Sequence, residues 1–458
     1  MQRLKKLFSA IDMARGTPWK KLLLFTLPLL IGNLFQQMYG TADAIILGRY
    51  VGDNALAAVG STLPLIFLIM VLLMGIAIGS GIMVSQYFGA KSRDDLSYTI
   101  GNSITITTIL GIVLMATGPV FTRPLLILLN TPAVILDDSV MYANILLWGI
   151  LTMAYFNVLS GILRGLGDAL APLIYLAVAC LLNIILNIVF IVGFGWGVAG
   201  VAVGTVIAQG LSSVLCLRRL LAMRDIFDMD KYYLRLKKQY SAQILKLGVP
   251  TGASHAIIAV AIMTVQPLVN NFGPMFIAAH VIVMRIDGFV MMPNFSFGNA
   301  MTVFAGQNMG AGKVERVSKG TKECAFLAVG SALILVTIIL LFGRHIAGAF
   351  TQTQEVIDLS HRMLMILAPG YVAFSLAMVF WGTVRGAGDA ISPLWGAAIN
   401  SIIIRVPSAF ILVHLMGTPE ALMLSLLMAW VCNMLLSVTV YKIGKWRTKG
   451  IIMQKEPT

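Results

Sequence analysis

The sequence has few charged residues: 33 lysines and arginines and 19 acidic residues, together 11% of its 458 residues. Soluble domains carry about 25% charged residues, because charge covers their surface. Hydrophobic residues make up 58% of the chain. Soluble globular, disordered, collagen-like and disulfide-scaffold proteins are therefore excluded, and the composition indicates a chain that crosses a membrane several times.

Cysteine is also scarce, and the motifs of soluble enzymes are missing. The four cysteines are far apart in the sequence and form no CxxC pair, so disulfide and zinc frameworks are unsupported. Walker A, GxSxG and HExxH patterns do not occur. We therefore expect no enzyme activity, no cofactor and no direct use of ATP. A cleavable signal peptide is not expected either, because the basic residues 1–21 run into an uncharged span that is too long.

The hydrophobic residues occur in long, uncharged runs. Strands of a membrane barrel are short and alternate in polarity, whereas a membrane-spanning helix needs about 20 mostly apolar residues. We therefore expect an all-α membrane protein with 12 transmembrane helices. They are predicted at residues 20–47, 54–83, 98–121, 138–163, 170–194, 199–222, 243–270, 276–304, 322–342, 358–383, 390–414 and 420–443.

The net charge of +14 is distributed unevenly between the predicted loops. With the N-terminus inside, 27 of the 33 basic residues fall in segments on the cytoplasmic side and three on the opposite side. This is the positive-inside pattern, which predicts a multi-pass protein of the cytoplasmic (inner) membrane with both termini in the cytoplasm. The basicity therefore reports topology and indicates no nucleic-acid partner.

The chain contains an internal repeat. Residues 161–173 and 382–394 are identical at eight of thirteen positions, with an offset of 221. The same offset relates Gln86 to Gln307, and an offset of 222 relates Pro28 to Pro250. Three matches at nearly one spacing indicate two homologous halves.

Each half contains six predicted spans, an even number, so the second half has the same orientation as the first. The repeats are then parallel and related by an axis along the membrane normal. The predicted division is a cytoplasmic N-terminal segment, an N-terminal lobe, a basic cytoplasmic linker, a C-terminal lobe and a cytoplasmic tail, at 1–20, 21–222, 223–242, 243–443 and 444–458.

The repeated RGxGDAxxPL motif falls in a turn after the fourth span of each half. Its glycines permit a tight turn, its aspartate can cap the next helix, and its proline suits the first helical turn. We interpret both copies as structural elbows.

Two similar bundles facing a cavity at the membrane midplane are typical of an alternating-access transporter. A channel is more often a ring of smaller subunits, and a receptor has no need of the duplication. A non-transporting receptor or channel is nevertheless the alternative from another functional class.

Only two of the 19 acidic residues, Asp43 and Asp287, lie deep within predicted spans. An ionised carboxylate at the membrane centre costs about 2.5–3.5 kcal/mol, so a retained acid calls for a reason. A desolvated acid can carry a proton, and polar neighbours that stabilise its ionised form would make it a sodium ligand. Gln36 and Tyr39 precede Asp43 by two turns and one turn on the same helix face, which makes them candidates for the substrate cavity.

Further oxygen-bearing side chains lie in the fifth and sixth spans. Asn183 and Asn187 are four residues apart and share a helix face, and Thr205 begins the apolar part of the next span. With Asp43, they could hold a proton or a hard cation such as Na⁺. The alternative is that the two asparagines only form hydrogen bonds between packed helices.

Asp287 admits two interpretations. If Arg285 or Arg405 pairs with it, Asp287 belongs to a structural ion pair; if it faces the cavity, it attracts cationic substrate. Met291 and Phe295 on the same span could contact apolar cations, although such residues in membrane helices more often serve packing.

Taken together, these features resemble the multidrug and toxic compound extrusion (MATE) family of secondary transporters. The resembling segments are residues 36–49, both RGxGDAxxPL elbows, the pair Asn183 and Asn187, and residues 306–311. The resemblance covers essentially the whole chain. It implies a V-shaped pair of six-helix lobes, acting as a monomer in the lipid bilayer, that expels small organic cations in exchange for H⁺ or Na⁺.

The resemblance also implies roles for single residues. Asp43 matches the aspartate of the family's first helix, and Asn183, Asn187 and Thr205 match polar positions grouped with it. Some relatives carry a second aspartate where this chain has Asn187, and another branch uses a glutamate in helix 7, where residues 243–270 contain no carboxylate. We therefore expect coupling through the N-terminal lobe, with Asp287 as the one possible substitute in the other.

The nearest alternative is a lipid-linked oligosaccharide flippase, which has a similar duplicated plan. A flippase for pyrophosphate lipids needs a strongly cationic cavity, and here only Arg285 and Arg405 lie deep in the spans. The sequence therefore favours the export of cations.

Overall fold

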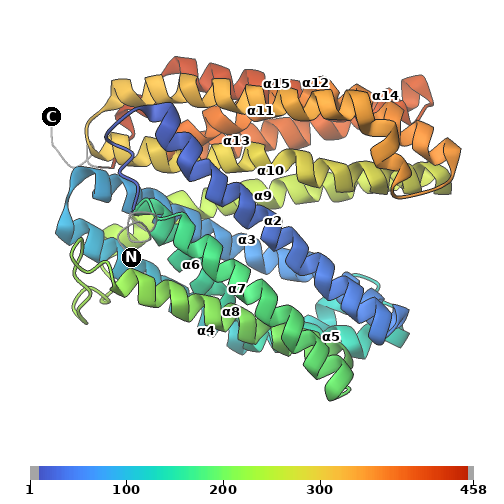
Figure 1. Ribbon diagram of the computed structural model, residues 1–458, viewed down its shortest axis with the longest axis horizontal. Helices are drawn as coiled ribbons and strands as arrows, with labels where there is room; N and C mark the ends of the chain where they lie inside the picture. The colour runs from blue at the N-terminus through green and yellow to red at the C-terminus, as the bar shows by residue number, and fades with distance from the viewer. Residues whose placement is uncertain (1–9, 452–458) are drawn as a thin grey trace. The chain divides into compact units, whose positions relative to one another are not determined.

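The computed structural model describes residues 10–451, which are predominantly helical (Figure 1). Eleven helices in this part of the chain are long and apolar enough to cross a membrane. They are α2 (Pro18–Tyr50), α3 (Asp53–Ala90), α4 (Arg93–Leu128), α7 with η1 (Leu170–Gly193), α8 (Gly197–Leu221), α9 (Lys238–Asn271), α10 (Pro274–Gly310), α11 (Val314–Gly348), α12 (Gln354–Gly386), α13 to α14 (Ile391–Met416) and α15 (Glu420–Ile443).

A further span is broken. The sequence predicts one helix over 138–163, but α5 (Ala133–Trp148) and α6 (Ile150–Gly165) meet at Gly149 with a bend of 52°. Val206 fills the space beside Gly149, where an added Cβ would come within 3.0 Å of its side chain. When this bent pair is counted as one span, the total is the predicted twelve.

Two other predicted spans contain π-helical segments. Val189–Gly193 (η1) continues α7 (Leu170–Ile188), and Ile399–Arg405 (η2) joins α13 (Ile391–Ala398) to α14 (Val406–Met416). The wider turn of a π-helix interrupts the regular hydrogen-bond ladder, and such segments frequently occur at functional sites. Apolar periodicity alone predicts neither segment.

Large apolar side chains lie on the outside of the helices. Phe326 is 82% exposed and Leu128 is 76% exposed, levels unusual for such residues in a soluble protein. Lipid chains would cover these surfaces, as expected of a multi-pass membrane protein.

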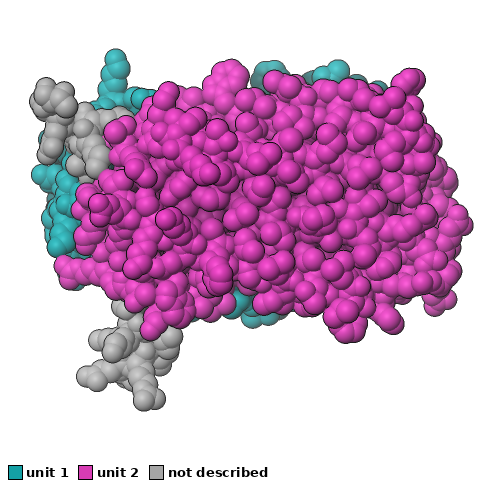
Figure 2. Space-filling view, turned by 90° about the horizontal axis from the view of Figure 1, so that it is seen from above, with its two compact units in different colours: residues 1–12, 31–252 teal, residues 13–30, 253–458 magenta. Residues whose placement is uncertain are grey.

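The described chain divides into two compact units (Figure 2). Unit 1 contains residues 10–12 and 31–252, and unit 2 contains residues 13–30 and 253–451. The first part of α2 thus belongs to unit 2, and the first part of α9 belongs to unit 1. The division predicted from sequence contains no such exchange, because hydropathy reveals spans and not the helices against which they pack.

Close helix packing recurs at equivalent positions in the two units. In unit 1, Gly161 on α6 lies against the backbone oxygen of Ala77 on α3; in unit 2, Gly382 on α12 lies against that of Gly298 on α10. A Cβ added at either position would come within 3.0 Å of that oxygen. Small residues allow membrane helices to approach at the backbone, and both repeats have kept this contact.

Both elbows have the predicted capping geometry. Asp168 accepts a hydrogen bond from the Ala171 N–H at 3.0 Å, and Asp389 accepts one from the Ser392 N–H at 3.0 Å. The preceding Gly388 has a φ of +103°, which glycine adopts at low cost. Both copies of the motif thus have the predicted turn and the predicted aspartate hydrogen bond to the next helix.

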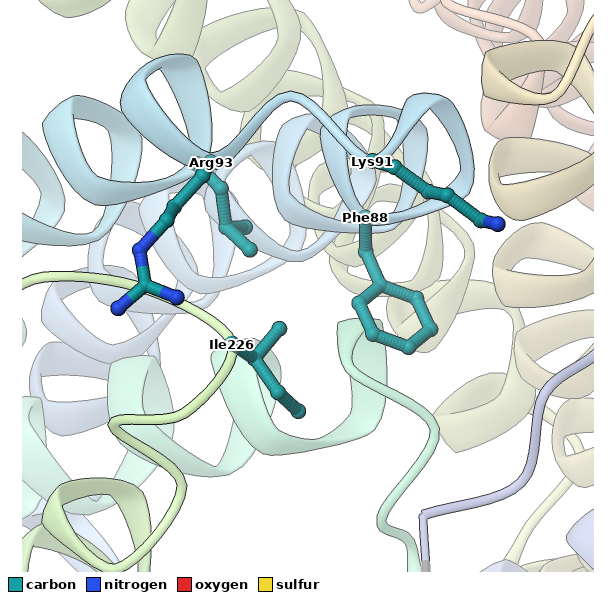
Figure 3. Close-up of a pocket in the computed structure, with 5 residues that line it drawn as sticks. Phe88, Lys91, Arg93 and Ile226 are labelled. Atoms are coloured by element: carbon teal, nitrogen blue, oxygen red, sulfur yellow. The ribbon is translucent and has the colours of Figure 1, made fainter.

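The segment between α8 and α9 is docked on unit 1. Arg93, the first residue of α4, donates to both carboxylate oxygens of Asp228 at 2.8 Å and to the Asp225 carbonyl at 2.7 Å. Arg93, Phe88 and Ile226 line a pocket (Figure 3), and its volume is about 240 Å³. The predicted linker is therefore an ordered part of the unit.

Candidate functional site

The polar cluster of unit 1 is centred on Asp43. This half-buried residue lies in the second part of α2, which belongs to unit 1. The Asn187 side-chain amide donates to its Oδ1 at 2.5 Å. A carboxylate otherwise surrounded by helices thus has a hydrogen-bond donor from α7.

The two asparagines and the threonine extend this contact into a chain. The Asn187 amide also donates to the Asn183 side-chain oxygen at 3.3 Å, and the Asn183 amide donates to the Thr205 hydroxyl at 3.4 Å. Both asparagines are fully buried, and Thr205 is 5% exposed. The structure therefore brings together all four residues predicted as the coupling site.

One acceptor in this cluster is unused. The Asn187 side-chain oxygen is buried and has no hydrogen-bond partner in residues 10–451. A buried acceptor without a donor is costly, so this atom favours the arrival of a proton donor or a cation. Gly204 on α8 provides its space, because a Cβ there would come within 3.0 Å of the oxygen.

The two other candidates on α2 have different surroundings. Tyr39 is buried near Asp43, and its hydroxyl has no hydrogen-bond partner among residues 10–451. Gln36 is exposed and makes no hydrogen bond to the cluster within the described chain. The structure thus brings Tyr39 to the site and leaves Gln36 outside it.

Unit 2 contains the other acid that lies deep within a predicted span. Asp287 on α10 is 7% exposed and accepts a hydrogen bond from the Tyr371 hydroxyl on α12. Arg405 on η2 interacts with Asp287 electrostatically, whereas Arg285 is exposed. Among the described residues, neither arginine forms a direct ion pair with Asp287. No sequence pattern predicts Tyr371 as its partner.

The two other candidates of unit 2 lie on the same helix as Asp287. Met291 is buried in the apolar core of the unit. Phe295 is 44% exposed and packs edge-on against Phe374, with ring centroids 5.6 Å apart. Neither makes a polar contact with Asp287 in the described chain.

Comparison with known proteins identifies the family. The MatE family model matches residues 28–189 and again residues 250–411, two segments of equal length with an offset of 222. This chain belongs to the MatE family. The two matches also confirm that the chain is a duplication.

The MatE relatives are named as drug resistance proteins. The chain is 31% identical to the probable multidrug resistance protein YoeA of Bacillus subtilis, over 91% of this chain and 94% of that protein. It is 25% identical to the probable multidrug resistance protein NorM of Thermotoga maritima, over 95% of each. This MatE chain is therefore similar along almost its whole length to proteins named for multidrug resistance, and its apolar helices are those of a multi-pass membrane protein.

Solved structures show the same MATE fold. A crystal structure of MATE in complex with MaL6 superposes with a TM-score of 0.89, at 23% identity, over 98% of this chain and 100% of that one. An outward-facing multidrug resistance MATE transporter gives a TM-score of 0.88 at 24% identity, over 98% and 99%. The all-helical fold predicted from the sequence is confirmed.

In this MatE chain, neither Asp43 nor Asp287 has an acidic counterpart in the other repeat. Asp43 has Val265 as its counterpart at an offset of 222, and Asp287 has Ile66 at an offset of 221. Each of the two described units thus has one carboxylate deep within its spans, at a position where the other repeat is apolar. The two carboxylates also differ in their surroundings: amides flank Asp43, and a tyrosine and an arginine flank Asp287.

Two residues near Asp43 were missed by the sequence analysis of this MatE chain. Tyr142 on α5 and Cys180 on α7 both interact electrostatically with Asp43. Cys180 precedes Asn183 by three residues, so helical periodicity could have placed it on the same face. Tyr142 comes from a different helix, and no local pattern predicts that it lies near Asp43. Residues 10–451 contain no group of three or more His, Cys, Asp or Glu side chains that could hold a metal ion.

Proposed function

We propose that this MATE transporter exports small organic cations in exchange for H⁺ or Na⁺, with Asp43 as the exchange site. The observation that carries the proposal is the Asp43 carboxylate in contact with Asn187, at the end of a buried chain of amides and a hydroxyl. This cluster combines one negative charge with neutral oxygens, a set suited to a proton or a hard cation. No cofactor is required for such an exchange.

In the proposed cycle, the coupling ion and the cationic substrate compete for the negative charge of Asp43. In the outward state, Asp43 takes up one H⁺ or Na⁺, and this occupancy weakens the binding of a cationic substrate. Neutralisation of Asp43 then favours return to the inward state, where the ion leaves and substrate binds. Alternating access follows because ion and substrate favour different states through one carboxylate.

The driving force depends on the stoichiometry. Exchange of one proton for one monovalent cation moves no net charge, so the ion gradient alone would drive export. One pH unit supplies about 1.4 kcal/mol. A second coupling ion would add the membrane potential, about 2.3 kcal/mol per charge at 100 mV.

The distribution of basic residues between the loops supports a membrane orientation for this cycle. With the N-terminus in the cytoplasm, 27 of the 33 basic residues lie on the cytoplasmic side. The protein would then act in the cytoplasmic membrane as a monomer, since each chain contains both repeats.

The test is efflux of ethidium, a fluorescent organic cation, from proteoliposomes under an imposed pH or sodium gradient. Asp43→Asn should abolish gradient-driven efflux, because the amide cannot exchange a proton or neutralise Na⁺. Asp137→Asn is the matched control, because Asp137 is 82% exposed and pairs with Arg123 at the surface. Full coupled efflux by Asp43→Asn would refute the assignment.

Measurements with and without sodium separate the two ions. An ethidium-dependent pH change that persists without sodium indicates proton exchange, whereas ethidium efflux that requires sodium and causes no pH change indicates Na⁺ exchange. Movement of a lipid-linked oligosaccharide without ethidium efflux would favour the flippase alternative. Single-channel currents would favour a channel.

A further inference from the structure

The two leading helices change unit at equivalent positions. Helix α2 passes from unit 2 to unit 1 between residues 30 and 31, and α9 passes from unit 1 to unit 2 between residues 252 and 253. The offset of 222 converts one boundary into the other. Each boundary lies two residues beyond a proline, Pro28 or Pro250. The change of unit along the leading helix is therefore common to both repeats.

Unit 2 holds the segment that precedes α2 by its backbone. The side-chain oxygen of Gln307 accepts from the Met13 N–H at 2.9 Å, and the Asn308 amide donates to the Met13 carbonyl at 3.1 Å. Arg316 donates to the Gly16 carbonyl at 2.6 Å. The Met13 side chain is fully buried. These contacts fix the chain just before the helix begins.

Unit 2 also caps α2 itself. The Glu323 carboxylate on α11 accepts from the Trp19 N–H at 2.7 Å. Trp19 is the second residue of α2, so its N–H has no partner within the helix. A carboxylate at a helix N-terminus also interacts favourably with the helix dipole.

Unit 1 holds the start of α9 in the same way. The side-chain oxygen of Asn102 on α4 accepts from the Lys237 N–H and from the Ser241 hydroxyl, each at 2.9 Å. Its amide group donates to the Arg235 carbonyl at 3.3 Å. Asn102 is fully buried.

The two contacts are equivalent by the repeat. An offset of 221 relates Asn102 to Glu323, and an offset of 222 relates Trp19 to Ser241. The acceptors differ, an amide in one repeat and a carboxylate in the other, and so do the donors, the Ser241 hydroxyl and the Trp19 backbone N–H; each acceptor nevertheless binds the first turn or two of the leading helix. The position has kept its contact while its chemistry has changed.

We propose that Glu323 and Asn102 are positioning residues for transport, which keep the first part of α2 with unit 2 and the first part of α9 with unit 1 throughout the cycle. The inference rests on the proposed function, because it concerns the motion that carries Asp43. Asp43 lies on α2 beyond the boundary, in unit 1. If the start of α2 stays fixed to unit 2, a movement of unit 1 displaces the part of α2 that carries Asp43 relative to that start. The change in α2 then occurs near residue 30.

The first experiment compares substitutions at Glu323. Glu323→Ala removes the acceptor and should lower kcat for ethidium export about fivefold with KM unchanged, because it affects a conformational step and not the binding of substrate. Glu323→Gln keeps a carbonyl acceptor and should restore most of the rate. Glu315→Ala is the control, because Glu315 is an exposed residue on the same helix. An unchanged kcat in folded Glu323→Ala would overturn the proposal.

The second experiment fixes each contact covalently. In a variant without the four native cysteines, the pairs Trp19→Cys with Glu323→Cys and Ser241→Cys with Asn102→Cys are joined by a short bifunctional thiol reagent. Cross-linking should form efficiently and should restore export, since neither contact needs to open. Loss of export in proportion to cross-linking would overturn the proposal, as would failure to cross-link.

These outcomes are distinct from failure of the proposed function. If the cysteine-free protein exports ethidium and Asp43→Asn stops it, a block caused by cross-linking refutes only the anchoring. If the cysteine-free protein exports no cation, the proposed function fails, and the cross-linking yield still tests whether the helix starts are docked.

Discussion

At the scale of single residues, the cluster around Asp43 depends on space as well as on polarity. The Asn187 amide donates to Asp43, while its oxygen is buried and has no hydrogen-bond partner in the described part of the chain. Both features require that the amide keep its present position. Gly204 permits this position because it leaves room beside the Asn187 oxygen.

Gly204→Ala should therefore impair transport without unfolding the protein. The added methyl group would come within 3.0 Å of the Asn187 oxygen and displace the amide from Asp43. We expect ethidium export to fall about tenfold, although alanine is the better helix former by about 1 kcal/mol. Gly210→Ala on the same helix is the control, because the nearest atom to its added Cβ is 3.5 Å away. Equal export by the two variants would show that the amide position is unimportant.

The predictability of the site also differs from residue to residue. Asp43, Asn183 and Asn187 could be predicted because a polar residue within an apolar span is conspicuous and helical spacing reveals a shared face. Tyr371 and Tyr142 could not, because tyrosine is common in membrane helices and their contacts join helices distant in sequence. The choice between Arg285 and Arg405 near Asp287 also required the packing of η2.

At the scale of elements, glycines decide how closely helices pack. The contacts of Gly161 with α3 and of Gly382 with α10 recur at an offset of 221. Such contacts cannot accept even one methyl group without moving a helix backbone. Helix boundaries follow from apolar runs, whereas these contacts depend on which helices meet.

Gly382→Ala should lower the thermal stability of the purified protein. Its added Cβ would overlap the backbone of Gly298, and overpacking of this kind costs about 1–3 kcal/mol. Gly330→Ala is the control, because nothing lies within 4 Å of the added Cβ and alanine favours the helix. Melting in detergent should show a lower midpoint for Gly382→Ala only. A midpoint equal to that of Gly330→Ala would mean that α10 and α12 separate easily.

The connection between α8 and α9 offers a second test at this scale. Hydrogen bonds from Arg93 lower the pKa of Asp228 below its ordinary value of about 3.9. A lowered pKa means that the contact stabilises the docked segment at neutral pH and is lost as the pH falls through the lower, folded-state value. Asp228→Asn should therefore increase tryptic cleavage within residues 222–237 at neutral pH, and Asp230→Asn, an exposed neighbour, should not. Equal cleavage would indicate that other contacts suffice.

At the scale of the whole molecule, the duplication was predictable from the sequence. The assignment of the first parts of α2 and α9 to the opposite units was not. Matching motifs and an even number of spans per half define two parallel repeats. Hydropathy contains no information on which neighbours a span contacts, so the assignment of residues 13–30 to unit 2 required coordinates. The bend at Gly149 was missed for the same reason, because the apolar run continues across it.

The uneven distribution of acids between the repeats predicts the charge moved in each cycle. Asp43 has no cationic partner among the described residues, whereas Asp287 interacts with Arg405, which offsets its charge when it is ionised. One exchangeable charge per molecule should then exchange one coupling ion for one substrate. Export of a monovalent cation would move no net charge, and export of a divalent cation would move one charge outward.

Ethidium and propidium, a monovalent and a divalent dye with the same ring system, test this stoichiometry. An inside-negative potential of 100 mV opposes outward movement of one charge by about 2.3 kcal/mol, or about fortyfold in the final gradient. We expect the potential to reduce the propidium gradient and to leave the ethidium gradient unchanged, with both measured in vesicles clamped by potassium and valinomycin. If the potential instead increases the ethidium gradient, a second ion enters. Loss of that increase in Asp287→Asn would then identify Asp287 as its site, because no other acid is as deeply buried within the described spans.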